Sequence, residues 1–488
     1  MRRSVVLAAL FSTSALAGPL VATEEGKLAS DAEAQDNFGY AVGVSGDMLL
    51  VGMPRDDDPY ASGSVRVYAR DSSGTWTEGQ KLLAADADTN HQFGFSLSIE
   101  GHRAVVGANR QPSDAGDGNA GAVYVFEYDS GAGTWSETAK LVADVRNAST
   151  MFGYSVGLSG DRIVVGAPGD GDDESYTGIA YVFDYDSGAS SWSQTASLVP
   201  TDAHGWMFAG QSVSVDGDRI LVGAYGDDHS GDFSGSAYVY DLAGSWAQTA
   251  KLVASLPAER ASFGQTVSLD GDRAVVGAPG DDAELPDAGA VYVYELSGGW
   301  SETARITGAT LGDSDNFGVA VALDGDVLLI GANADDDGGN NAGATYAFEH
   351  DGSAWSESAK LLASDAQDSG TFGSSVDVEG ERAAIGGFGH TDFAGSAFAF
   401  GLQIDTESDT DTDTDTDTDT DTDTDTDADT DTDTDTDSDT DTGPMDTGPG
   451  GDDAGCGCQA TSGATGALAL IMLPLLFLRR RRTSTSLR

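Results

Sequence analysis

The feature that most constrains the fold of this 488-residue chain is a motif that recurs seven times. One copy, residues 152–168, reads Phe-Gly-Tyr-Ser-Val-Gly-Leu-Ser-Gly-Asp-Arg-Ile-Val-Val-Gly-Ala-Pro. The copies are anchored on phenylalanines spaced 54 to 59 residues apart: Phe38, Phe93, Phe152, Phe208, Phe263, Phe317 and Phe372. Self-similarity at a fixed period of this length is typical of solenoids and propellers.

Each unit contains four short stretches with strand character. Phe-Gly-x-Ser-Val-x-Leu alternates apolar and small residues, Arg-Ile-Val-Val-Gly-Ala is β-branched, Ala-Val-Tyr-Val-Phe (122–126) is β-branched and aromatic, and residues 135–142 begin on a tryptophan. Helical periodicity is missing from the units. Four-stranded antiparallel units joined by Gly/Asp turns predict an all-β propeller whose seven blades pack radially.

The two ends of the repeat array predict how the ring closes. Six units end on a fourth stretch that starts with tryptophan: Trp76, Trp135, Trp192, Trp246, Trp300 and Trp355. The seventh unit stops at residues 398–401 without one, whereas residues 25–29 near the N-terminus match residues 137–141. We therefore expect an N-terminal strand to complete the last blade, as an open solenoid would not share a blade between its ends.

These motifs resemble those of a known family. Phe-Gly at the start of a unit, Gly-Ala-Pro in its middle and seven units overall are similar to the FG-GAP repeats of the integrin α-subunit propeller, in their short bacterial form, over roughly residues 24 to 402. The integrin type carries a calcium loop, Asp-x-Asp-x-Asp-Gly, between its first two strands. Here that turn is as short as Ser159-Gly160-Asp161, so the family's calcium ligands are not carried over.

The turns between the second and third strands are longer and rich in aspartate. Because the turns of an antiparallel meander alternate between two faces, these turns share one face with the links between units. Their candidate ligands for Ca²⁺ are Asp56, Asp58, Asp170, Asp172, Asp173, Asp227, Asp228, Asp281, Asp282, Asp335 and Asp337. Three interpretations stay open: solvated turns that use aspartate as a turn former, a divalent-cation site, and a surface for a basic ligand. The links differ between units, as at His204 and Trp206, which is where a specific binding surface would arise.

Three segments lie outside the repeats. Residues 1–17 resemble a signal peptide, with Arg2 and Arg3 before an apolar run and a cleavage site after Ala17. After the propeller (18–403), residues 404–453 alternate Asp and Thr and predict a disordered, extended linker. Residues 454–488 contain an apolar stretch (463–478) that predicts a short, marginal transmembrane helix, followed by four arginines expected on the cytoplasmic side.

The C-terminal segment carries a second resemblance. Gly-Cys-Gly-Cys, a short hydrophobic helix and an arginine cluster are similar to the MYXO-CTERM sorting signals of Gram-negative surface proteins. This resemblance implies processing at Cys456 and Cys458 by export and sorting machinery, and display at the cell surface or outer membrane, where the protein is either retained or released. A disulfide between the two cysteines is the alternative, although one intervening residue would strain it.

Charge and missing motifs narrow the function. Residues 18–403 hold 59 acidic and 17 basic residues, a net charge near −42, which argues against nucleic-acid partners. Six scattered histidines (His91, His102, His204, His229, His350 and His390) form no metal-binding spacing, and no nucleophile elbow occurs in a strand–turn–helix context. We therefore predict a non-enzymatic adhesion or ligand-binding propeller, with an extracellular protein or polysaccharide as ligand and Ca²⁺ as its only expected cofactor. The alternative is a surface hydrolase or lyase that uses acidic rim residues with His204 or His229.

Overall fold

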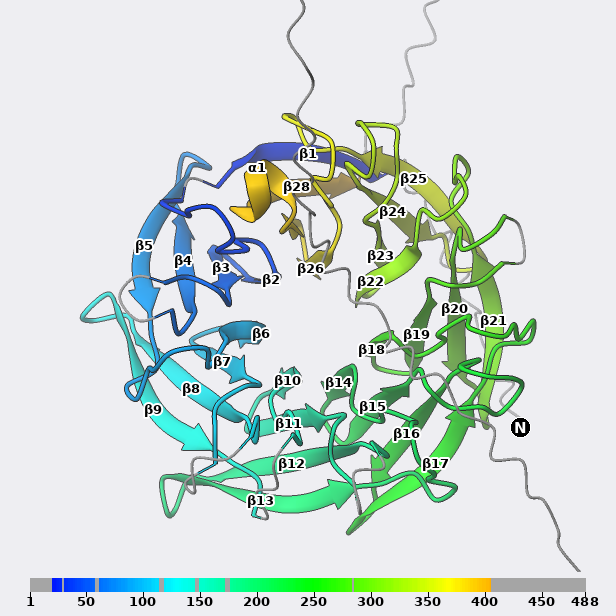
Figure 1. The fold of residues 1–488 in the computed structure, drawn as a ribbon, viewed down its shortest axis with the longest axis horizontal. Coiled ribbons are helices and arrows are strands. Elements are labelled where there is room, and N and C mark those ends of the chain that lie inside the picture. Colours follow the sequence, from blue (N-terminus) through cyan, green and yellow to red (C-terminus); the bar gives the residue numbers. More distant parts are fainter. Residues whose placement is uncertain are drawn as a thin grey trace, which may run out of the picture. The chain divides into compact units, whose positions relative to one another are not determined.

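The computed structural model describes residues 20–404 apart from 29, 58–60, 114–117, 145–148, 172–175 and 283–284. In this range the chain forms seven four-stranded antiparallel sheets that surround a central axis as blades (Figure 1). The all-β, seven-bladed propeller is therefore confirmed. The predicted signal peptide with Ala17, the linker and the sorting segment with Cys456 and Cys458 lie outside the described residues. Within those residues, no helix combines the length and the hydrophobicity needed to cross a membrane.

Six blades each consist of four consecutive strands, the first innermost and the fourth outermost (Figure 1). Blade 1 contains β2 (Ala41–Ser45), β3 (Met48–Met53), β4 (Ser64–Arg70) and β5 (Trp76–Leu82). Blade 2 contains β6 (Phe93–Glu100), β7 (Arg103–Ala108), β8 (Ala122–Asp129) and β9 (Thr134–Leu141). Blade 3 contains β10 (Ser155–Ser159), β11 (Arg162–Ala167), β12 (Ile179–Asp186) and β13 (Ser191–Leu198). Blade 4 contains β14 (Val213–Asp216), β15 (Arg219–Ala224), β16 (Ser236–Leu242) and β17 (Trp246–Leu252). Blade 5 contains β18 (Thr266–Asp270), β19 (Arg273–Ala278), β20 (Ala290–Leu296) and β21 (Trp300–Ile306). Blade 6 contains β22 (Phe317–Asp324), β23 (Val327–Ala332), β24 (Ala344–His350) and β25 (Trp355–Leu361).

The seventh blade joins the two ends of the described chain. It contains β26 (Ser375–Glu379), β27 (Arg382–Gly387), β28 (Ser396–Ile404) and β1 (Leu20–Lys27), with the short helix α1 (His390–Phe393) between β27 and β28. β1 runs antiparallel to β28, with Leu20 opposite Ile404 and Lys27 opposite Phe398. This confirms closure by an N-terminal strand, which begins five residues before the predicted match at Glu25.

Apolar side chains fill the gaps between neighbouring blades. Each of the seven buried clusters draws residues from two adjacent blades; one contains Val123 and Val125 of blade 2 together with Phe152 and Val165 of blade 3. Phe152 is 1% exposed, and its ring packs against that of Phe183 at a centroid distance of 5.8 Å. Phe152 is therefore a wedge between the two blades.

One predicted anchor is wrong. In blade 4 the wedge position belongs to Ala209, which bridges Gly178 as Phe263 bridges Gly235 in the next blade. Met207, fully buried, belongs to the cluster between blades 3 and 4, whereas Phe208 is only partly buried. The reason is local: this unit reads Phe-Ala-Gly instead of Phe-Gly, so the register of the motif moves by one residue.

Glycine on the second strand allows the blades to approach each other closely. A Cβ atom added to Gly166 would lie 2.0 Å from the backbone oxygen of Gly210 in the next blade. No side chain can occupy that space, which explains why glycine holds this position in all seven second strands. The residue after it is alanine in five of them, Met53 in the first and Gly387 in the last.

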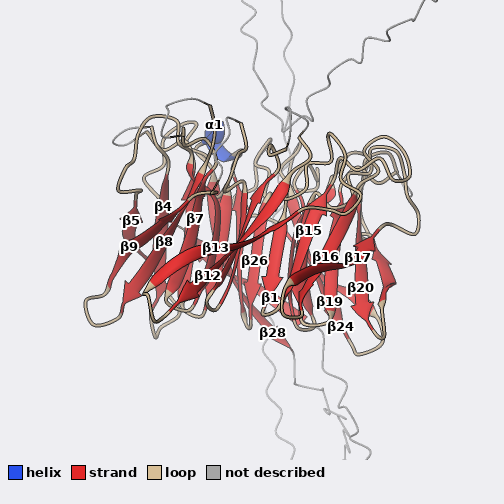
Figure 2. Ribbon diagram, turned by 90° about the horizontal axis from the view of Figure 1, so that it is seen from below, coloured by secondary structure: helices blue, strands red, loops and turns tan. Residues whose placement is uncertain are grey.

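The connections lie on two faces of the ring (Figure 2). The turns between second and third strands and the links between blades lie on one face, here called the rim face, as the bridges from Gly121 to Phe152 and from Gly343 to Phe372 show. The other connections form the hairpin face, where Gly160 and Asp161 join β10 to β11. Because β28 runs from the rim face to the hairpin face, the chain leaves the last blade at Ile404 on the hairpin face.

Hydrogen bonds on the hairpin face join every blade to the next. The last residue of each first strand accepts a hydrogen bond from the turn glycine of the following blade, over 2.5 to 3.1 Å. The acceptor and donor residues are Ser45 and Gly101, Glu100 and Gly160, Ser159 and Gly217, Asp216 and Gly271, Asp270 and Gly325, Asp324 and Gly380, and Glu379 and Gly46. The last of these pairs joins blade 7 to blade 1, so the same contact closes the ring.

Candidate functional site

The first aspartate of each acidic turn is buried beneath the rim face. These five aspartates are between 1% and 5% exposed: Asp56, Asp170, Asp227, Asp281 and Asp335. Their main-chain carbonyls accept hydrogen bonds from the glycines that precede the third strands, as Asp227 does from Gly235 at 2.8 Å. The repeated aspartate therefore shapes the turn from which the third strand begins.

The carboxylates of these aspartates bind side chains from the third and fourth strands of the same blade. Tyrosine hydroxyls donate to four of them over 2.5 to 3.0 Å: Tyr181 to Asp170, Tyr238 to Asp227, Tyr292 to Asp281 and Tyr346 to Asp335. Lysine or arginine pairs with four of them over 2.6 to 2.9 Å: Lys81 with Asp56, Lys251 with Asp227, Arg305 with Asp281 and Lys360 with Asp335. Asp227, Asp281 and Asp335 thus tie their turns to both outer strands, whereas Asp170 binds Tyr181 of the third strand and Asp56 pairs with Lys81 of the fourth.

Sequence reasoning missed these partners, although a signal for them was present. Tyrosine recurs in the third stretch of the units and Lys or Arg recurs just before the end of the fourth. In blade 2, where Gln111 occupies the place of the aspartate, the role passes to Asp86 of the link, which binds Tyr124 at 2.6 Å and Lys140 at 2.6 Å. The constellation is therefore maintained even when its carboxylate comes from another segment.

The remaining predicted metal ligands are placed differently. Asp228 and Asp282 are exposed and accept main-chain hydrogen bonds within their own turns, at 3.0 and 2.7 Å, and Asp337 pairs with Lys360 at 2.5 Å. Asp58, Asp172 and Asp173 lie outside the described residues. Over the part of the chain that the structure covers, no three His, Cys, Asp or Glu side chains converge in an arrangement able to hold a metal ion. Calcium binding stays a prediction.

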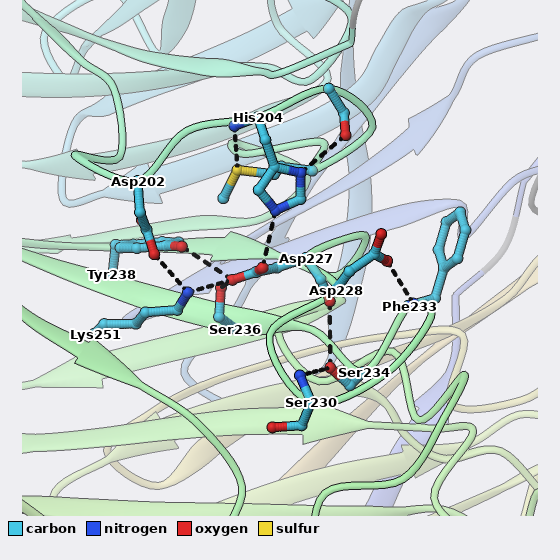
Figure 3. A network of polar contacts seen from close by, with 12 residues as sticks. Asp202, His204, Asp227, Asp228, Ser230, Phe233, Ser234, Ser236, Tyr238 and Lys251 are labelled. Atoms are coloured by element: carbon cyan, nitrogen blue, oxygen red, sulfur yellow. Dashed lines mark hydrogen bonds and ion pairs between the residues drawn. The ribbon is translucent and has the colours of Figure 1, made fainter.

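Blade 4 carries the most elaborate version of this constellation (Figure 3). The carboxylate of Asp227 accepts hydrogen bonds from Ser236 at 2.6 Å and Tyr238 at 3.0 Å and pairs with Lys251 at 2.6 Å. Nε2 of His204, from the link before the blade, lies 3.1 Å from its other oxygen. A second carboxylate, Asp202, lies 2.7 Å from the Lys251 ammonium.

These contacts decide how the central groups titrate. Burial alone would raise the pKa of the Asp227 carboxyl, but hydrogen bonds from Lys251, Ser236 and His204 outweigh burial and lower the pKa to about 2. Partial burial disfavours charged His204, yet its hydrogen bonds to Asp227 and to the Gly205 carbonyl raise its pKa above the ordinary value. The Asp227 carboxyl is therefore anionic at neutral pH and lies beside the Lys251 ammonium, whose own pKa, despite partial burial, is raised by its hydrogen bonds to Asp202 and Asp227.

The geometry assigns His204 a cationic role. Its Nδ1 lies 3.0 Å from the carbonyl oxygen of Gly205 and its Nε2 faces the carboxylate of Asp227, so both ring nitrogens meet acceptors. An imidazole that donates at both nitrogens holds its proton and is a poor general base. The sequence offered His204 or His229 as the partner of an acidic rim residue; the structure brings His204 to Asp227 and leaves His229 exposed. The absence of enzymatic activity stays a prediction.

Comparison with known proteins identifies the repeat. A family model described as the FG-GAP repeat matches seven times, at residues 23–68, 76–126, 135–183, 192–240, 246–294, 300–348 and 355–400. The chain belongs to the FG-GAP repeat family. Each FG-GAP repeat begins in the fourth strand of one blade and ends in the third strand of the next, so the first repeat begins within β1 and every repeat spans a seam between blades.

Two further comparisons were made. No curated protein matches the FG-GAP chain. Among solved structures, the chain is similar to Sqt1 of Saccharomyces cerevisiae at 12% sequence identity and a TM-score of 0.43, over 75% of this chain and 84% of that one.

Proposed function

We propose that this FG-GAP propeller is an adhesion or ligand-binding module that binds through its rim face. FG-GAP propellers commonly serve in ligand binding or adhesion. The observation that carries the proposal is that one face is the same in every blade while the other varies. On the hairpin face all seven seams use the same hydrogen bond, whereas the links on the rim face differ from blade to blade. A constant scaffold with variable loops on one face is the arrangement in which specific recognition arises.

The way in which the chain leaves the propeller supports display. It exits at Ile404 on the hairpin face, opposite the proposed binding face. We propose that residues 1–17 direct export and that residues 404–488 tether the propeller to the surface of a Gram-negative cell, either permanently or until processing at Cys456 and Cys458 releases it. The ligand would be an extracellular protein or polysaccharide, and calcium bound at the rim would stabilise the turns.

The test compares the two faces with the fragment 18–403, whose ring is closed by β1 and β28 within the fragment itself. Binding to whole cells, polysaccharides and proteins is screened first. In one variant residues 199–210 before blade 4 are replaced by the equivalent residues 307–318 of blade 6, and in a matched control the hairpin-face turn 71–75 of blade 1 is replaced by the turn 351–354 of blade 6. Loss of binding in the first variant alone supports the proposal. Equal binding by both variants, with melting curves unchanged, refutes it.

A further inference from the structure

A row of aromatic side chains lies on the rim face beside the Asp227 constellation. It begins at Trp206, whose ring centroid is 5.1 Å from that of Tyr176, and continues from Tyr176 to Phe208 over 5.8 Å. Phe208 stacks on Tyr225 at 5.1 Å with an interplanar angle of 14°, and Tyr225 lies 6.1 Å from Phe233. We call these five residues the aromatic row; they come from the turns of blades 3 and 4 and from the link between these blades.

The aromatic row does not belong to the core that holds the blades together. None of its members occurs in the buried clusters described between blades 2 and 3, 3 and 4, or 4 and 5. All five are at least partly exposed, and Trp206 is 43% exposed. The shift of register in blade 4 contributes directly, since it leaves Ala209 in the wedge position and directs Phe208 to the row.

Four of the five residues adopt a backbone conformation that disfavours large side chains. The φ angles of Tyr176, Trp206, Phe208 and Phe233 are 50°, 72°, 55° and 54°. The same positions are left-handed in other blades, where they hold mostly small or polar residues, with Phe393 of blade 7 as a bulky exception: Gln35, Asn37, Ala61, Asn90, Gln92, Ser149, Met151, Arg260, Ser262, Asp287, Ser314, Asn316, Asn341, Ser369, Thr371 and Phe393. Glycine, asparagine and serine relieve such positions, while bulky residues in them are outliers. Local strain of this kind indicates a functional demand rather than a folding one.

The polar groups around the aromatic row indicate the chemical class of its ligand. The carboxylate of Asp228 accepts a hydrogen bond from the main-chain N–H of Phe233 at 3.0 Å (Figure 3). Asp232, in the same turn, and Glu259, in the next link, are both exposed. The two segments are close, since a Cβ atom added to Gly231 would lie 2.7 Å from Cγ of Glu259. These carboxylates accept hydrogen bonds from hydroxyl and amide groups and repel anions. Neutral sugars combine C–H faces that pack on aromatic rings with hydroxyls that donate to carboxylates, and a row of rings suits a chain of sugar units.

We propose that the aromatic row is a binding platform for a neutral or N-acetylated glycan chain, in which pyranose faces pack on Trp206, Tyr176 and Phe208 while hydroxyls donate to Asp228 and Asp232. The inference rests on the proposed function and names the ligand class and the site of contact. The net negative charge of the rim would repel anionic glycans.

The test uses an array of neutral and N-acetylated oligosaccharides, with heparin and a Lys/Arg-rich peptide as comparison ligands, followed by titration of the strongest binder. Trp206→Ala and Tyr176→Ala are expected to weaken its binding at least tenfold. Phe393→Ala is the matched control, because Phe393 is 38% exposed on the rim face with a φ of 65° but lies in blade 7. Its affinity should equal that of the unmodified protein. The intrinsic tryptophan fluorescence that changes on binding should lose this change in Trp206→Phe.

Trp206→Asn separates a binding role from a structural one. Asparagine tolerates the left-handed conformation, so this variant should melt no lower than the unmodified protein while it loses the glycan. A lower melting temperature with glycan binding intact would show that the aromatic row is structural and would overturn the proposal. If no neutral glycan binds but whole cells or proteins do, the glycan proposal fails and the ligand-binding proposal stands. If nothing binds, both fail.

Discussion

At the scale of single residues, the buried aspartates show how one side chain can look like a metal ligand and serve a different purpose. The acid-rich turns suggested carboxylates that face solvent. Instead Asp227 and its four equivalents are buried, and each holds a tyrosine, a cation or both from the outer strands. A buried carboxylate is stable only when paired and hydrogen-bonded, and these partners meet both requirements.

Asp227→Asn should therefore destabilise the propeller strongly. Asparagine keeps the shape of the side chain but leaves the Lys251 ammonium without its buried counter-charge, which costs roughly 3 kcal/mol for a pair of this kind. Urea unfolding of the fragment 18–403 measures the loss. Asp228→Asn, in the same turn but exposed, is the control and should change stability by no more than about 0.5 kcal/mol. Equal effects of the two substitutions would contradict the assigned role.

At the scale of elements, the seam between β26 and β2 contains a carboxyl group that makes stability depend on pH. Oδ2 of Asp377 accepts the main-chain N–H of Val44 at 2.8 Å across the seam. Burial raises the pKa of this carboxyl to about 7, and the negative charges of Glu379 and Asp324 add to the increase. The folded state therefore holds the proton more tightly than the unfolded chain does.

A raised carboxyl pKa fixes the direction of the pH effect. The stabilisation is complete below the unfolded pKa of 3.8 and is lost as the pH rises through about 7. Asp377→Asn should thus raise the melting temperature at pH 8 and leave it unchanged near pH 3, and the difference should grow between these limits. Thermal melts across this range test the prediction, with exposed Asp313→Asn as control. A constant difference at all pH values would contradict it.

Closure by β1 is the second prediction at this scale. Deletion of residues 18–27 removes all seven residue pairs between β1 and β28 and exposes the edge of β28 in the last blade. We expect this variant to aggregate or to lose cooperative unfolding, as gel filtration and calorimetry would show. Deletion of residues 413–488 is the control and should leave the melting temperature of the propeller unchanged. A monomeric β1 deletion that melts like the control would contradict the closing role.

Much of this fold could be read from the sequence because seven copies repeat the same pattern. Strand positions, blade count and the closing strand followed from alignment of the units. The partners of the turn aspartates did not, because Asp227, Tyr238 and Lys251 meet only when three strands have paired. Phe208 was misassigned because one inserted alanine moved the register, which only the packing of Ala209 reveals. The aromatic row was not predicted, because a left-handed backbone conformation cannot be recognised from the sequence at a position that holds Trp or Phe instead of Gly or Asn.

At the scale of the whole propeller, calcium remains the open electrostatic prediction. The five buried aspartates already carry tyrosine or cationic partners, so rim binding would depend on exposed residues such as Asp228, Asp282 and Asp336. If Ca²⁺ binds the folded state alone, a concentration one hundred times its Kd adds about 2.7 kcal/mol to the free energy of unfolding. Melting curves of the fragment 18–403 with Ca²⁺ and with chelator decide the matter, and equal midpoints would reject the prediction.

The course of β28 from the rim face to its exit at Ile404 has a mechanical consequence. A pull on a tail that leaves from the hairpin face would act on the end of this strand, along its length rather than across it. β28 is flanked by β27 on one side and β1 on the other, with six and seven residue pairs respectively. Tension applied to the strand at Ile404 would load these pairs in shear, many at once, instead of peeling them apart one by one, so both neighbouring strands would share the load.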